Sequence, residues 1–163
     1  MRILAVDPGE KHIGLALSDA SGTIASALTV INHVKRSVDA AIIASLAAEH
    51  AVERIIVGQA LDDEGEAGFR ARPAQRLAEA IRAQTSLPVE LWDESYSTQT
   101  ARQVRIEMGA PRRQRRGHLD SLAAMIILQD YLGQPSKEGQ PSGEGKPSGE
   151  DQLSGEGKHE NKP

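Results

Sequence analysis

The opening segment holds the most constraining feature of the chain, two apolar runs separated by a tight polar turn. The runs are Ile3 to Val6 and Ile13 to Leu17, and Asp7-Pro8-Gly9 begins the turn. Short apolar runs around a turn with Pro and Gly are typical of a β-hairpin. Asp7 then stands at the exit of a nearly all-apolar strand, where a charge is costly without a partner. A metal ion or a bound phosphate would explain that position, and so would an ordinary turn.

The composition of the chain changes sharply after Leu132-Gly133. Residues 134–163 repeat a six-residue unit rich in Pro, Ser, Gly and Glu, with Leu153 as the only large apolar residue. Such a segment cannot bury enough apolar surface to offset the entropy of ordering. We therefore expect one folded domain over residues 1–133 and a disordered, low-complexity tail over 134–163.

The folded part has a legible order of elements. Strands are expected near 2–7, 13–18, 24–31, 54–58 and 88–93, and helices near 37–50, around Leu77 to Ile81, from Ser97 or Thr98 to Met108, and over 119–132. Three consecutive strands followed by alternating helix and strand predict an α/β fold, a mixed five-stranded sheet flanked by helices. The right-handed crossover rule favours the strand order 3-2-1-4-5. Asp7 then lies at the carboxyl end of the central strand, where open α/β sheets place their sites.

Composition excludes several classes of protein. The chain has no cysteine, no apolar run of the roughly 18 residues that a membrane span needs, and no signal-peptide pattern, so we expect a cytoplasmic protein without a membrane partner. The histidines show no paired ligand spacing, which argues against zinc. Only four residues are aromatic, so contacts with nucleic acid are expected to be mainly electrostatic.

Three acidic residues stand beside apolar elements. Asp7 ends the first strand, Glu94 directly follows the strand ending at Asp93, and Asp120 begins the buried last helix. Each alone has an ordinary explanation as a turn residue, an exposed loop residue or a helix N-terminal acid. If the three converge, their hard oxygen ligands suit Mg²⁺ or Mn²⁺. Two such ions about 4 Å apart would serve an in-line displacement at phosphorus.

A basic segment precedes the third acid. Arg112, Arg113, Arg115 and Arg116 lie between Pro111 and His118. A charge run is ordinarily a solvated loop, but beside a metal site it would follow a phosphate backbone.

The first turn adds Lys11 to these candidate phosphate contacts, and its backbone N–H groups could cradle a phosphate. A similar hairpin binds nucleotide phosphates in the actin, Hsp70 and sugar-kinase superfamily. Those proteins need two such domains, and this chain has room for one. The Walker A pattern is also absent, so an ATPase is disfavoured.

Four motifs in order resemble the YqgF family. They are DPGEKHIGLALSD, IIVGQALDDEGEAG, VELWDESYSTQTA and HLDSLAAMIILQDYL, and together they span nearly all of residues 1–133. The resemblance implies a ribonuclease H-like fold and a metal-dependent nuclease. The family is described both as Holliday junction resolvases and as the nuclease that matures the 5′ end of pre-16S rRNA.

The resemblance also implies residue roles and partners. Asp7, Glu94 and Asp120 become the catalytic, metal-binding acids for Mg²⁺ or Mn²⁺. The implied partner is nucleic acid, and precursor rRNA is the substrate expected first. Branched DNA, or a binding module without catalysis, is the alternative. Cutting a four-way junction normally needs two sites, so the chain is expected to be a monomer or a homodimer.

Three positions depart from the family pattern. Ser95 stands where an arginine usually follows Asp-Glu, Gly58-Gln59-Ala60 replaces a Gly-x-Pro turn, and His12 replaces a common arginine. The three acids are retained, so the departures bear on substrate preference and turnover rather than on metal binding.

Overall fold

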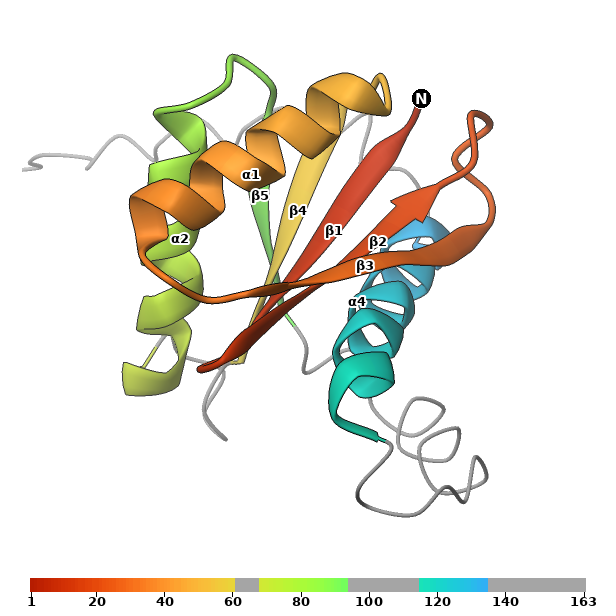
Figure 1. Cartoon of the computed structure of the whole chain (residues 1–163). Helices are drawn as coiled ribbons and strands as arrows, with labels where there is room; N and C mark the ends of the chain where they lie inside the picture. Colours follow the sequence, from red (N-terminus) through yellow and green to blue (C-terminus); the bar gives the residue numbers. More distant parts are fainter. Residues whose placement is uncertain (61–67, 94–114, 135–163) are drawn as a thin grey trace, which may run out of the picture.

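The computed structural model describes residues 1–60, 68–93 and 115–134 (Figure 1). Its strands and helices follow the predicted order closely. They are β1 (Ile3–Pro8), β2 (His12–Ser18), β3 (Ala25–Asn32), α1 (Arg36–Glu49), β4 (Arg54–Gln59), the short 3-10 helix η1 (Phe69–Ala71), α2 (Arg72–Arg82), β5 (Val89–Asp93) and α4 (Arg115–Gly133). The helix predicted to end at Met108 and the tail beyond residue 134 lie outside the described residues.

The five strands form one mixed sheet in the order β3-β2-β1-β4-β5, so the predicted strand order is confirmed. β1 is antiparallel to β2, with Leu4 opposite Leu17. It is parallel to β4 on its other side, and β4 is parallel to β5. β1 is therefore the central strand, and it is where the antiparallel hairpin meets the parallel half of the sheet.

The sheet separates two hydrophobic clusters, because alternate residues of a strand point to opposite faces. Leu4 and Val6 belong to the cluster that includes residues of α1 and α2. Ile3 and Ala5 belong to the cluster that includes Ala124, Ile127 and Leu128 of α4. Figure 1 shows the same division, with α1 and α2 on one side of the sheet and α4 on the other.

Helix α1 buries a face that the apolar pattern does not predict. Val38 and Ile42 have the spacing of an apolar stripe, yet their side chains are 41% and 37% exposed. The neighbouring stripe of Asp39, Ile43 and Ala47 is buried instead. A carboxylate can take a buried position when hydrogen bonds compensate its lost hydration, and Asp39 has such partners, described below.

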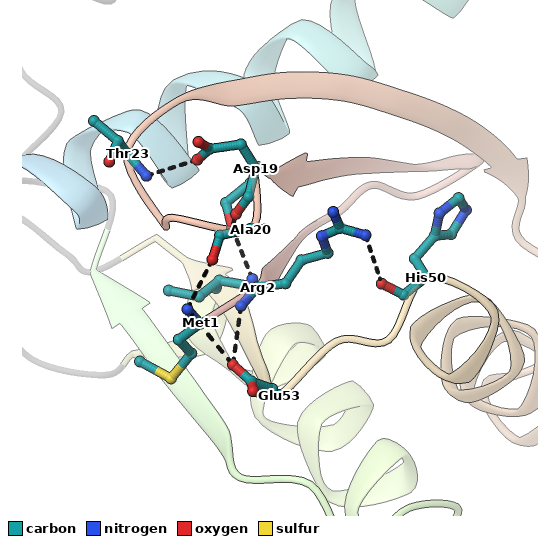
Figure 2. A network of polar contacts seen from close by, with 9 residues as sticks. Met1, Arg2, Asp19, Ala20, Thr23, His50 and Glu53 are labelled. Carbon is teal, nitrogen blue, oxygen red and sulfur yellow. Dashed lines mark hydrogen bonds and ion pairs between the residues drawn. The ribbon is translucent and has the colours of Figure 1, made fainter.

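Polar contacts hold the beginning of β1 (Figure 2). The amino group of Met1 donates to the carbonyl oxygen of Ala20 at 2.9 Å and lies 3.7 Å from a carboxylate oxygen of Glu53. The guanidinium of Arg2 donates to the carbonyl oxygen of His50 at 3.1 Å. These contacts join β1 to the β2–β3 turn and to the end of α1, so they help to fix the position of the strand that carries Asp7 at its other end.

Candidate active site

Three strands end at one edge of the sheet, and acidic residues lie there. Asp7 is the penultimate residue of β1, and Asp93 is the last residue of β5. Val6 pairs with Val57, and Gly58 and Gln59 pair with Trp92 and Asp93. Adjacent strands are about 4.8 Å apart, so the backbones at Asp7 and Asp93 are separated by β4, or roughly 10 Å. This is the edge at which the sequence predicts a site.

The turn after Asp7 is too tight for a side chain at position 9. A Cβ atom on Gly9 would lie 2.2 Å from the carbonyl oxygen of His12, so only glycine fits without a backbone shift. The turn is also joined to the end of β3, because the carbonyl oxygen of Lys11 accepts a hydrogen bond from the His33 N–H at 2.9 Å. The Lys11 side chain is exposed. The turn therefore presents a cation beside Asp7 on a constrained backbone.

Helix α4 is held at its carboxyl-terminal end. The indole N–H of Trp92 donates to Asp130 at 3.2 Å, and the two rings of Trp92 and Tyr131 meet edge to face with centroids 4.9 Å apart. Arg54, the first residue of β4, donates to the hydroxyl of Tyr131 at 2.8 Å. Arg54 therefore places the end of α4 over the beginning of β4, and Trp92 joins the same end of the helix to β5.

The beginning of α4 lies toward the opposite edge, where β1 and β4 end. Position 120 is ten residues before Asp130, which is about 15 Å along a helix axis. Figure 1 shows the teal beginning of α4 at the end of the sheet away from the N label. The helix backbone at Asp120 is thus at the Asp7 end of the sheet.

The described residues include only part of the predicted site. Asp7 and Lys11 lie in β1 and in the turn after it. Asp120, Arg115 and Arg116 lie in α4, where the structure describes their backbone. Glu94, Arg112 and Arg113 lie outside the described residues. Among the side chains that the structure describes, which do not include those of residues 115–120, no group of three or more His, Cys, Asp or Glu is arranged to hold a metal ion.

A cavity of about 530 Å³ also reaches Asp7, and the sequence analysis does not predict it. It lies between the sheet edge, the beginning of α1 and the beginning of α2, and its lining includes His33, Arg36, Asp39 and Phe69. A histidine six residues before an aspartate in a helix rich in Ala and Ile is the one signal that could have indicated this place. His33 and Asp39 come together only through the turn between β3 and α1, which that spacing does not predict.

A family model described as "RuvX: Holliday junction resolvase" matches residues 1–134. The chain belongs to the RuvX family. This confirms the YqgF resemblance, since the two names denote one family. Relatives named "Putative pre-16S rRNA nuclease" include one from Syntrophus aciditrophicus, 42% identical over 138 residues, covering 85% of this chain and 92% of the relative. One from Chloroflexus aurantiacus is 41% identical over 130 residues, covering 80% of this chain and 85% of the relative.

The solved structures show the fold. The RuvC protein of T. thermophilus, solved in complex with a Holliday junction substrate, aligns with a TM-score of 0.54 at 19% identity, over 80% of this chain and 94% of that one. Together with the strand order, this likeness confirms the expected ribonuclease H-like fold. In the described part of the chain, no helix is both long and apolar enough to cross a membrane.

Proposed function

We propose that this RuvX-family chain is a metal-dependent nuclease that hydrolyses phosphodiester bonds of precursor rRNA at the 5′ end of 16S rRNA. The observation that carries the proposal is Asp7. It lies at the carboxyl end of the central strand of a ribonuclease H-like sheet, in a chain about 40% identical to relatives named as pre-16S rRNA nucleases. Precursor rRNA as the substrate also implies that the protein works in the cytoplasm.

Asp7, Glu94 and Asp120 are the proposed ligands of the metal. Glu94 follows Asp93, the residue that ends β5, and Asp120 lies in the part of α4 nearest the same sheet edge. Carboxylate oxygens are the ligands that Mg²⁺ and Mn²⁺ prefer, so this donor set fits either ion. Two bound ions would activate the attacking water and stabilise the leaving oxygen.

The remaining proposed roles belong to cations. Lys11 is exposed on the turn beside Asp7, where its ammonium group can neutralise a substrate phosphate. Arg112, Arg113, Arg115 and Arg116 precede Asp120 and supply four further positive charges for the backbone of a structured RNA. In this arrangement the carboxylates hold the metal and the basic residues hold the polymer.

A second candidate substrate is the four-way DNA junction, favoured by the description of the matching family. Junction resolution needs two cuts and hence two copies of the site, whereas RNA trimming needs one. The mass of the protein in solution, with and without each substrate, therefore separates a homodimer that works on junctions from a monomer that works on RNA.

The test is cleavage of a 5′-extended 16S rRNA fragment and of a four-way junction in Mg²⁺ and in Mn²⁺. We expect the RNA to be cut, and we expect Asp120→Asn to lose activity by more than about 100-fold, because even indirect partners of a metal ligand change activity by 10–100-fold. Glu49→Gln, an exposed carboxylate at the end of α1, is the matched control and should retain full activity. If neither substrate is cut, the nuclease proposal is wrong and the chain is a nucleic-acid-binding module without catalysis.

A further inference from the structure

The cavity beside Asp7 has the size of a small-molecule site. Its volume of about 530 Å³ is within the range of roughly 300–1,000 Å³ that ligand pockets occupy. Asp7 and Gly58 line it from the sheet, His33 lines it from the segment between β3 and α1, and Arg36 and Asp39 line it from the beginning of α1. A group bound in it would therefore lie at the end of the sheet that carries the proposed site of phosphodiester cleavage.

One wall of the cavity carries an aromatic ring that is almost fully exposed. Phe69 begins η1 and is 82% exposed, the largest exposure among the large hydrophobic residues described. The guanidinium carbon of Arg72 lies 5.7 Å from the ring centroid, so a cation supports the ring. Trp92 of β5 and Tyr131 of α4, in contrast, pack against each other. Phe69 is thus the described aromatic ring that is available for stacking.

Polar groups on the α1 side of the cavity are held in place. Asp39 is completely buried and accepts hydrogen bonds from Nδ1 of His33 and from the Val34 N–H, the latter at 3.2 Å. Because Nδ1 is engaged by the carboxylate, Nε2 is the ring nitrogen with which His33 can meet a ligand. Arg36 adds N–H donors to the same lining. Hydrogen-bonding groups with a fixed orientation are what a nucleobase edge requires.

We propose that the cavity accepts one unpaired nucleotide of the substrate, with its base against Phe69 and its edge toward His33 and Arg36. The inference rests on the proposed nuclease function and specifies its substrate as a strand that is unpaired beside the cleaved bond. A paired base cannot enter without being unstacked, which costs free energy that an unpaired base does not pay. The chain therefore distinguishes single-stranded ends from continuous duplex.

The first test measures binding without metal, in EDTA, so it does not depend on cleavage. Fluorescence anisotropy gives the Kd for a labelled oligouridine strand and for a labelled RNA duplex. We expect Phe69→Ala to weaken oligouridine binding by about 10-fold, a typical effect of losing one stacked base, and to change duplex binding by less than about 2-fold. Phe69→Trp should restore binding. Ile24→Ala, at an exposed residue just before β3, is the control.

The second test uses an abasic nucleotide, placed in turn at each position around the cleaved bond. At the position that occupies the cavity, removing the base should slow cleavage by wild type. Phe69→Ala should slow cleavage of the intact substrate by a similar factor, and it should cleave the abasic substrate no more slowly than wild type does. Three results of the binding test would each overturn the inference. They are an equal Kd of wild type and Phe69→Ala for oligouridine, an equal loss of affinity for oligouridine and for the duplex in Phe69→Ala, and no binding of oligouridine by wild type. Binding that depends on Phe69 without any cleavage would refute the proposed function alone.

Discussion

The contact between His33 and Asp39 gives a prediction whose magnitude can be worked from the structure. Asp39 Oδ2 lies 2.5 Å from Nδ1 of His33, and Oδ1 accepts the Val34 N–H at 3.2 Å. Each of these hydrogen bonds to a charged group contributes about 1.5–3 kcal/mol, and removing the carboxylate also removes part of the cost of burying it. Asp39→Ala should therefore lower the free energy of unfolding by about 2–4 kcal/mol.

His33→Ala should be costly for a different reason. It leaves a fully buried carboxylate with one described donor, the Val34 N–H. Removing one partner of a buried pair costs up to about 3–5 kcal/mol. His33 itself is 38% exposed, and water can reach part of the vacated space, so we expect about 2–3 kcal/mol.

The double variant separates the contact from its surroundings. Once Asp39 is gone, removing His33 leaves no buried charge unpaired, so the double variant should cost about 1.5–3 kcal/mol less than the sum of the single variants. Urea unfolding at neutral pH, followed by circular dichroism, measures all four free energies. Ser45→Ala, at an exposed position of α1, is the control and should stay within about 0.5 kcal/mol of wild type. Additivity within that error would refute the assigned pairing.

Three further predictions concern the backbone and the turns. Ala51 follows the end of α1 with a φ of 51°, a backbone conformation that favours glycine. Ala51→Gly should therefore stabilise the fold by about 0.5–1 kcal/mol, whereas Ala41→Gly, inside the helix, should destabilise it by a similar amount. Thermal unfolding of both variants shows whether their effects have opposite signs. Gly9→Ala should cost about 1–3 kcal/mol in urea unfolding, because a Cβ there would overlap backbone; an unchanged midpoint would show that the turn yields freely. The N–H of Ile24, then the Ser21 hydroxyl and the Thr23 N–H, lower the pKa of Asp19. Its charged form therefore stabilises the fold above about pH 4 and loses that effect as the pH falls, so the stability gap between wild type and Asp19→Asn should narrow in acid.

Local sequence predicted the sheet because its strands are short, apolar and punctuated by turns. The position of Asp7 could be predicted since it depends only on where β1 ends, and the strand order puts that strand at the centre of the sheet. The catalytic roles of Asp7, Glu94 and Asp120 stay predictions. Glu94 lies outside the described residues, and Asp120 is described through its backbone alone.

The buried face of α1 and the cavity could not be predicted in this way. Apolar spacing favoured Val38 and Ile42, but Asp39 is buried on the neighbouring stripe because His33 and the Val34 N–H compensate its charge. That compensation depends on the path of the chain between β3 and α1. The cavity depends further on how α1 and α2 approach the sheet, which periodicity within one helix does not encode.

The most direct test of the central claim is the rate at which wild type and Asp7→Asn cut a 5′-extended 16S rRNA fragment in Mg²⁺. Asp19→Asn makes the same chemical change at the turn after the far end of β2 and is the control. If Asp7 holds the metal, its variant should cut more than about 100-fold more slowly, with the control close to wild type. Equal rates for wild type and Asp7→Asn, with both proteins folded, would contradict the assignment of this sheet edge as the active site.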